Sequence, residues 1–165
     1  MKLLKTIDKL NEYLDIKLKD AKEPDKERLS YQLLSNIQAI EKTSGKIVSW
    51  SLSLLGGSFL AILSDEFVHP EIKYFKLAYF IFVPGWIFTM MSINYGLMVS
   101  GCLSAAHRNL SNFELLRIGF DNCQASSRRQ IRCFKTALVL FGIWLLAYLS
   151  WWILTDLPVK KLINL

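Results

Sequence analysis

Three long stretches of the chain contain no charged residue, and charged segments separate them. These uncharged runs cover residues 47–64, 77–106 and 136–155, with lengths of 18, 30 and 20 residues. A helix needs roughly 20 apolar residues to cross the hydrocarbon core of a bilayer. The pattern therefore predicts an all-α integral membrane protein with three transmembrane helices.

The first 46 residues have a different pattern, in which apolar residues recur three and four positions apart among many charges. This spacing predicts two helices, each with one apolar face. The apolar residues are Leu3, Ile7, Leu10 and Leu14 in the first helix, and Leu29, Leu33, Ile37 and Ile40 in the second. Residues 1–46 are expected to form a cytoplasmic helical hairpin that packs on the rest of the chain, joins neighbouring subunits or lies on the membrane surface. Gly45 either interrupts the second helix or lets it continue into the first span.

The first two runs each carry a line of small residues at a spacing of about four. The first line is Gly45, Ser49, Ser53, Gly57 and Ala61, and the second is Gly85, Thr89, Ser92, Gly96, Ser100 and Ser104. Small residues let helices approach closely in lipid, and hydroxyl groups can bond between helices or line a narrow wet path. The two lines predict a tightly packed hairpin of the first two spans or, in an oligomer, the lining of a pore. Asn94 is expected to hydrogen-bond between helices, with ion coordination as the alternative.

The second run is longer than one crossing of a bilayer requires. At about 1.5 Å per residue it would be roughly 45 Å long as a helix, against a hydrocarbon core of about 30 Å. This helix must tilt, kink at Pro84 and Gly85, or project into the cytoplasm. We expect residues 65–76 to form a short external turn, residues 107–135 a basic cytoplasmic linker, and residues 156–165 an external tail.

The third run differs from the other two because it is rich in aromatic residues. Its large side chains include Phe141, Trp144, Tyr148, Trp151 and Trp152. This composition predicts an outer helix that faces lipid, with its Trp pair at the external interface, where Trp is enriched.

The positive charges are unevenly distributed between the segments that separate the runs. Of the 20 Lys and Arg residues, 16 precede the first run or lie between the second and third, and 4 lie in the other two segments. The positive-inside rule then predicts a cytoplasmic N-terminus and an external C-terminus. Arg128, Arg129 and Arg132 are expected to anchor the cytoplasmic end of the third span. Much of the net charge of +6 has this topological explanation and does not by itself indicate nucleic-acid binding.

Residues suited to catalysis or metal binding are scarce. The two histidines, His69 and His107, fall on opposite sides of the predicted membrane, and the chain has no HExxH, GxSxG, Walker A or GxGxxG motif. No carboxylate lies within a predicted span, which argues against a proton-coupled transporter. The three cysteines are expected to be reduced thiols. We therefore expect neither an enzyme nor a bound cofactor or metal.

One cytoplasmic feature has the composition of a ligand site. Lys2, Lys5 and Lys9 share one face of the first predicted helix, and in a homo-oligomer they would form a positive ring. Such a ring would attract a nucleotide or an oligonucleotide. The alternative is a face that contacts only solvent and lipid headgroups.

The layout as a whole resembles small membrane effectors of bacterial antiphage systems, including SLATT-like proteins and the channel partner of the Hailong nucleotidyltransferase system. The likeness covers charged helices at 1–46, a small-residue hairpin at 47–106 and a basic linker. It implies a homo-oligomeric channel of the bacterial inner membrane, gated by a nucleotide from a nucleotidyltransferase-type partner, that depolarises the cell in antiviral defence. Two other functions fit the residues: a non-conducting adaptor that anchors a cytoplasmic partner, and a holin-like protein.

Overall fold

The computed structural model describes residues 23–63, 80 and 82–156 of the chain. Over these ranges the chain is helical without any strand, so the prediction of an all-α protein is confirmed there. The first helix of the predicted hairpin, the predicted turn at 65–76 and the tail beyond residue 156 lie outside the described residues.

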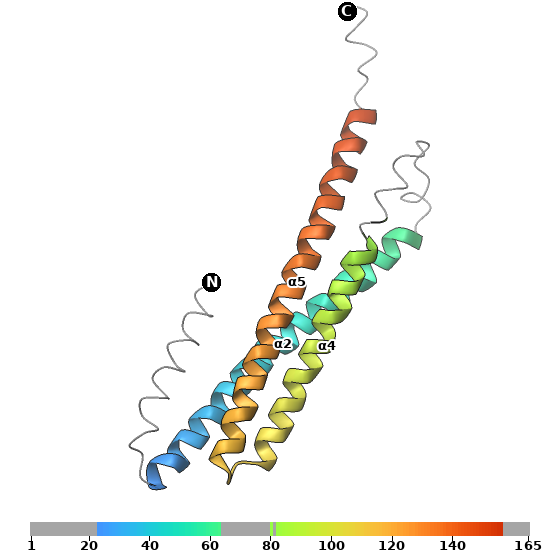
Figure 1. Ribbon diagram of the computed structural model, residues 1–165. Coiled ribbons are helices and arrows are strands. Elements are labelled where there is room, and N and C mark those ends of the chain that lie inside the picture. The colour runs from blue at the N-terminus through green and yellow to red at the C-terminus, as the bar shows by residue number, and fades with distance from the viewer. Residues whose placement is uncertain (1–22, 64–79, 81, 157–165) are drawn as a thin grey trace, which may run out of the picture.

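Three helices make up the described part of the chain, and they run side by side (Figure 1). They are α2 (Glu23–Leu63), α4 (Phe82–Arg108) and α5 (Phe113–Asp156), with lengths of 41, 27 and 44 residues. α4 runs antiparallel to the other two. α2 and α5 run in the same direction. Trp50, in the C-terminal half of α2, contacts Phe134 near the middle of α5, with 6.2 Å between the ring centroids.

α2 passes through Gly45 without a break, so this glycine lets the charged helix continue into the first uncharged run. A backbone hydrogen-bond ladder continues through glycine as readily as through other residues, and the cost is mainly entropic. Pro24 lies in the first turn of α2, where the missing N–H removes no helical bond. The charged and the apolar parts of this segment therefore belong to one continuous helix, about 60 Å long.

A tight turn joins α4 to α5. Asn109 N donates to Ala105 O at 3.1 Å, and Asn112 N donates to Asn109 O at 3.0 Å. Asn112 also caps α5, because its side-chain oxygen accepts a hydrogen bond from Leu115 N at 3.2 Å. Most of the expected linker, residues 107–135, is consequently part of α5.

The buried residues of the three helices alternate in spacing between three and four. In α4 they are Phe82, Gly85, Thr89, Ser92, Gly96, Val99 and Ala106; in α5 they include Leu116, Phe120, Cys123, Gln130, Ala137, Phe141 and Trp144; and in α2 they include Leu33, Ile37, Ser44, Ile47, Ser51 and Ser58. A seven-residue repeat of this kind is the pattern of a coiled coil. The described part of the chain is thus an antiparallel three-helix coiled coil.

Two apolar clusters occupy the two ends of this coiled coil. One contains Leu33 and Ile37 of α2, Val99 of α4, and Leu116 and Phe120 of α5. It lies at the end where the charged residues are. The other joins Phe82 at the start of α4 to three residues of α5, which are Ala137, Phe141 and Trp144.

The burial of Phe141 and Trp144 corrects, for these two residues, the expectation that the aromatic residues of the third run face lipid. The side chains of Trp151 and Trp152 lie outside the described residues. The rings of Phe141 and Trp144 pack edge-on against Phe82, at centroid distances of 5.4 and 4.6 Å. The exposed side of α5 is instead aliphatic, as Val139 and Leu146 show. Aromatic rings gain more from packing against each other than against lipid, because edge-to-face contacts add to the burial of their surface.

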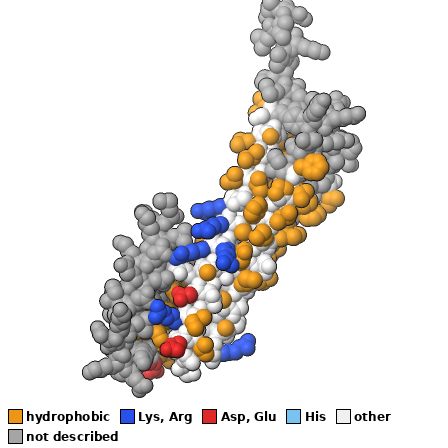
Figure 2. Space-filling model, viewed as in Figure 1, with side chains coloured by type: hydrophobic (Ala, Val, Ile, Leu, Met, Phe, Trp, Pro, Cys, Tyr) orange, Lys and Arg blue, Asp and Glu red, His pale blue; other side chains and the backbone are white. Residues whose placement is uncertain are grey.

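α4 and residues Phe113–Ser150 of α5 are long and apolar enough to cross a membrane, by length and composition. This agrees with the second and third predicted spans and is compatible with a membrane location. Figure 2 shows apolar side chains gathered over one end of the molecule and charged side chains over the other. The first predicted span, residues 47–64, forms the C-terminal part of α2, whose description ends at Leu63, and it stays a prediction.

α4 runs from the apolar end of the molecule well into its charged half. Its residues Val99 and Ala106 pack in the cluster with Leu33 and Leu116, on the charged half of the coiled coil. Pro84 is the third residue of α4 and lies in its first turn, so it bends no established helix. The excess length of the second run is therefore used for packing beside α2 and α5.

Candidate functional site

The middle of the coiled coil contains a buried polar layer that includes Ser44, Gln130 and Gly96. Ser44 Oγ donates to Gln130 Oε1 at 2.6 Å, and Gln130 Nε2 donates back to Ser44 O at 3.2 Å. Both side chains are almost completely buried. A Cβ on Gly96 would lie 2.7 Å from Gln130 Nε2 and would also collide with Val48 Cγ2. The glycine therefore leaves the space that the amide of Gln130 occupies.

Two further polar contacts follow along α2 toward the apolar end. Ser51 Oγ donates to Ser92 Oγ at 3.3 Å, and both hydroxyls are buried. Trp86 Nε1 donates to Ser58 Oγ at 2.8 Å, and Ser58 Oγ donates to Leu55 O at 2.7 Å. Ser44, Ser51 and Ser58 are seven residues apart, so one line of serines on α2 supplies the polar contacts to both neighbouring helices.

The small-residue line of α4 divides into a buried part and an exposed part. Thr89, Ser92 and Gly96 are buried, and Thr89 Oγ1 donates to Gly85 O at 2.7 Å within the same helix. Ser100 and Asn94 are exposed, so in this chain Asn94 points away from the other two helices. The spacing of these residues explains the division. From Gly85 to Gly96 the intervals are four, three and four residues, which keeps them on one face of α4. Ser100 follows Gly96 by another four residues and therefore lies outside the core.

The small-residue line of α2 lies on the outer surface of the coiled coil. Ser49, Ser53 and Gly57 are exposed, and Ala61 is half-buried. Ser49 Oγ donates to Gly45 O at 3.2 Å and Ser53 Oγ donates to Ser49 O at 3.0 Å, both within α2. Within the described ranges, a Cβ at Gly45 or Gly57 would meet no atom within 4 Å beyond the backbone of its own helix. The structure does not bring the small lines of α2 and α4 together, so the expected hairpin interface is formed by Ser44, Ser51 and Ser58 instead. We call Gly45, Ser49, Ser53 and Gly57 the exposed stripe.

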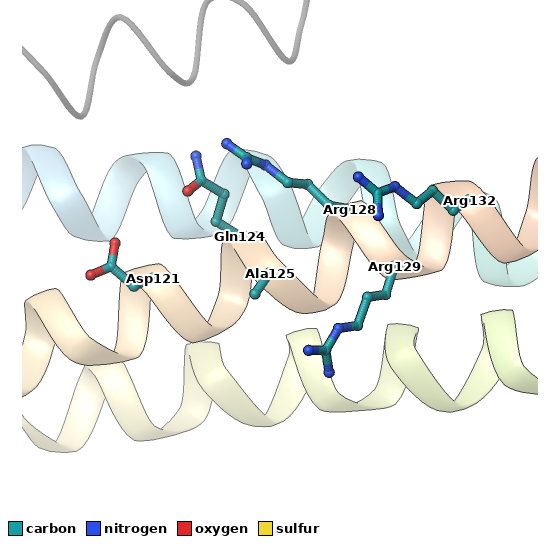
Figure 3. A pocket seen from close by; sticks show the side chains of 6 residues that line it. All are labelled: Asp121, Gln124, Ala125, Arg128, Arg129 and Arg132. Carbon is teal, nitrogen blue, oxygen red and sulfur yellow. The ribbon is translucent and has the colours of Figure 1, made fainter.

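The three arginines expected to anchor the third span line a pocket on α5. This pocket has a volume of about 220 Å³, and its described lining is Asp121, Gln124, Ala125, Arg128, Arg129 and Arg132. Arg128 and Arg132 extend from one side of α5 together with Gln124, and Arg129 extends from the other side (Figure 3). Lys2, Lys5 and Lys9 lie outside the described residues, so the predicted lysine face remains a prediction.

The chemistry available in the described ranges is that of binding and packing. Over these ranges there is no group of three or more His, Cys, Asp or Glu side chains that could hold a metal ion. The cysteines at 102, 123 and 133 are free thiols, and Cys123 belongs to the core cluster at the charged end.

The buried polar layer was not among the sequence predictions, although the sequence carries a signal for it. Gln130 lies seven residues from both Cys123 and Ala137, in the middle of a repeat of small and apolar residues that runs from Leu116 to Trp144. In a coiled coil, a polar residue at a core position of the repeat is typically buried and bonded to a residue of a neighbouring helix. The repeat was not recognised because residues 107–135 were predicted to be a linker.

Comparison of the chain with models of protein families, with curated proteins and with solved structures gives no match.

Proposed function

We propose that this protein is an integral membrane protein whose protomers associate through the exposed stripe of α2 into a homo-oligomeric channel. The observation that carries the proposal is that Ser49, Ser53 and Gly57 are exposed on the outer side of α2. The hydrogen bonds of the two serines described above stay within α2. Because packing among the described parts of the three helices does not use the stripe, we take its small residues to be available for contact between chains.

The residues around the stripe support assembly rather than simple lipid contact. Leu52, Phe59 and Leu60 flank it and are exposed, and large side chains of this kind fill the spaces between lipid tails. A line of Gly and Ser provides little surface for lipid, but it lets the backbone of a second helix approach closely. Two protomers can therefore gain packing and hydrogen bonds at this line that lipid cannot supply.

A conducting path would have to lie between protomers. The interior of one coiled coil is filled by Gln130, Trp86 and Phe141, and the polar groups of its central layer are bonded to each other. The serine hydroxyls of the exposed stripe now bond to carbonyl groups of their own helix, so each can still accept a hydrogen bond from water. Several copies of α2 around an axis would give a narrow path lined by Ser49 and Ser53.

The charged half of the coiled coil would then be cytoplasmic, as the positive-inside rule predicts. A ligand that binds there could act on the channel, because α2 extends from the charged half to the exposed stripe without interruption. The likeness to antiphage effectors supplies the ligand class to test first, a nucleotide, and the physiological role, depolarisation during antiviral defence.

A second candidate function is a membrane adaptor without conduction, and one observation favours it. Tyr31, Leu115 and Ile118 are large apolar side chains that are about half exposed or more on the charged half of the molecule. Exposed apolar groups outside the apolar end are available for a cytoplasmic partner. In this case the exposed stripe would serve assembly or lipid contact alone.

The test compares two glycine substitutions at positions where a new Cβ would meet no other helix in the described part of the chain. Gly57→Leu adds bulk to the exposed stripe, and Gly101→Leu adds the same bulk to the outside of α4. Each variant is purified in mild detergent, its mass is determined, and the same sample is recorded in planar bilayers. We expect Gly57→Leu and Ser53→Leu to reduce the oligomer and abolish discrete currents, with Gly101→Leu unaffected.

Unchanged currents and unchanged mass in both stripe variants would refute the channel as proposed. The adaptor would be favoured if the wild-type protein is oligomeric and never conducts. It would also require that a protein co-purifies with the wild type and is lost when Tyr31 and Ile118 are replaced by Ser.

A further inference from the structure

We infer that the pocket on α5 is a binding site for a phosphate group, held by Arg128 and Arg132 with Arg129 at its edge. The described lining carries three guanidinium groups and one carboxylate, a net charge of +2. The described lining shares no residue with the exposed stripe. The inference rests on the proposed membrane placement of α4 and α5 and does not depend on conduction.

The spacing of the arginines along α5 suits a single anion. Arg128 and Arg132 are one helical turn apart, about 6 Å along the axis, and they extend from the same side of the helix (Figure 3). Ala125 lies one turn before Arg129, and its small side chain leaves room between the longer ones. Two guanidinium groups can then contact different oxygens of one tetrahedral anion.

Arginine favours phosphate over a simple monovalent anion. The planar guanidinium group presents several N–H donors, so it can bind two oxygens of a phosphate at once. The amide of Gln124, on the same side of α5, adds a neutral donor. Asp121 at the far end of the pocket opposes a bound anion and would limit its affinity.

The position of the pocket along α5 allows two sources for the phosphate group. Lys135 is the last charged residue before the uncharged part of α5, which begins at Thr136, and Arg132 precedes Thr136 by four residues, about 6 Å. At this depth a side chain reaches the headgroup layer just outside the hydrocarbon core. The other end of the pocket, at the exposed residue Asp121, lies further from the apolar part, at a depth that suits a soluble ligand. A lipid headgroup and a free phosphate compound share the same chemistry here, and the experiment separates them.

The test measures thermal unfolding of the full chain in neutral detergent, followed by tryptophan fluorescence. Two probes are titrated: phosphatidic acid in mixed micelles, with phosphatidylcholine as the lipid control, and soluble inorganic pyrophosphate. A ligand that binds only the folded protein raises the unfolding midpoint, and the titration gives an apparent Kd. We expect the midpoint to rise with at least one of the two probes and to stay unchanged with phosphatidylcholine.

Substitutions distinguish a built site from a general positive field. Arg128→Gln/Arg132→Gln should raise the apparent Kd by about tenfold or more, and Arg128→Lys/Arg132→Lys severalfold, because an ammonium group keeps the charge but loses the two-oxygen contact. Asp121→Asn should lower the apparent Kd. The matched control Arg108→Gln/Arg117→Gln removes the same charge from exposed positions outside the pocket, and we expect less than about a twofold change.

A response to phosphatidic acid alone would assign the site to a lipid headgroup, and a response to pyrophosphate would assign it to a soluble phosphate compound. Either result supports the inference. No response to either probe would overturn it. So would a full response in Arg128→Gln/Arg132→Gln, or an equal loss in the control variant, because each would show that the arginines of the pocket do not form a specific site. None of these results depends on currents, so failure here and failure of the proposed channel can be told apart.

Discussion

Replacing Gly96 with Ala tests whether the polar layer holds the three helices at close distance. The new Cβ would lie 2.7 Å from Gln130 Nε2 and would also collide with Val48 Cγ2. Val48 is β-branched and has few alternative rotamers in a helix, so it cannot turn away easily. The amide of Gln130 is held by two hydrogen bonds to Ser44. Either the helices separate or this pair is broken.

The expected cost follows from three terms of different sign. Overpacking a well-filled core costs about 1–3 kcal/mol, and breaking a buried hydrogen bond costs about 1–3 kcal/mol. The change from Gly to Ala within a helix stabilises by about 1 kcal/mol. The central values sum to a net loss of about 3 kcal/mol, which lowers the unfolding midpoint by roughly 6–12 °C in a chain of this size.

The assay compares Gly96→Ala with Gly101→Ala, a matched substitution on the same helix. Among the residues that the structure describes, none outside the local backbone of α4 lies within 4 Å of a Cβ at Gly101, so this variant gains helix propensity without a clash there. We expect the unfolding midpoint of Gly101→Ala to equal or exceed that of the wild type, and that of Gly96→Ala to fall below it. Scans should use one detergent and one heating rate, since unfolding of such proteins can be irreversible. A midpoint of Gly96→Ala at or above that of Gly101→Ala would refute the close packing described here.

Two further predictions concern the interior of the coiled coil. Ser44→Ala should lower the unfolding midpoint, because it leaves Gln130 Oε1 without its donor in a buried position, at a cost of about 1–3 kcal/mol; adding Gln130→Leu should restore part of the loss, since both polar partners are then removed. A double variant less stable than Ser44→Ala alone would contradict this. Phe141→Ala should cost about 3–5 kcal/mol because it leaves a cavity beside Phe82, whereas Val139→Ala, on the exposed side of α5, should cost far less. Equal unfolding midpoints for these two variants would show that Phe141 faces lipid after all.

The sequence predicted the helices well because their signal is long and simple. An uncharged run of 20 or 30 residues has few structural alternatives: α4 contains residues 82–106 of the second run, and α5 contains the third run. Packing between helices was one of the two alternatives predicted for Thr89, Ser92 and Gly96, and these residues are buried, since their spacing of three and four keeps them on one face.

The contacts between helices were harder to predict, for a geometrical reason. Residues spaced only by fours advance about 40° around a helix at each step, so the line from Gly45 to Gly57 turns by about 120°, and all of it lies on the side of α2 that is exposed. The serines that face the core, Ser44, Ser51 and Ser58, are seven apart and return to the same face after two turns. Similarly, Phe141 looked lipid-facing because composition shows that a residue is apolar without showing which partner it meets.

Because α2 has no break, it can accept insertions and deletions only of particular lengths. Inserting one residue near Gly45 would rotate the whole C-terminal part of the helix by about 100° relative to its N-terminal part. Ser51 and Ser58 would then no longer reach Ser92 and Trp86, although every side chain of the original sequence would still be present. An insertion of seven residues would restore the rotation but lengthen α2 alone by about 10 Å. Only insertions of seven made together in α2, α4 and α5 would preserve all the contacts, so the three helices can be lengthened or shortened only as a set.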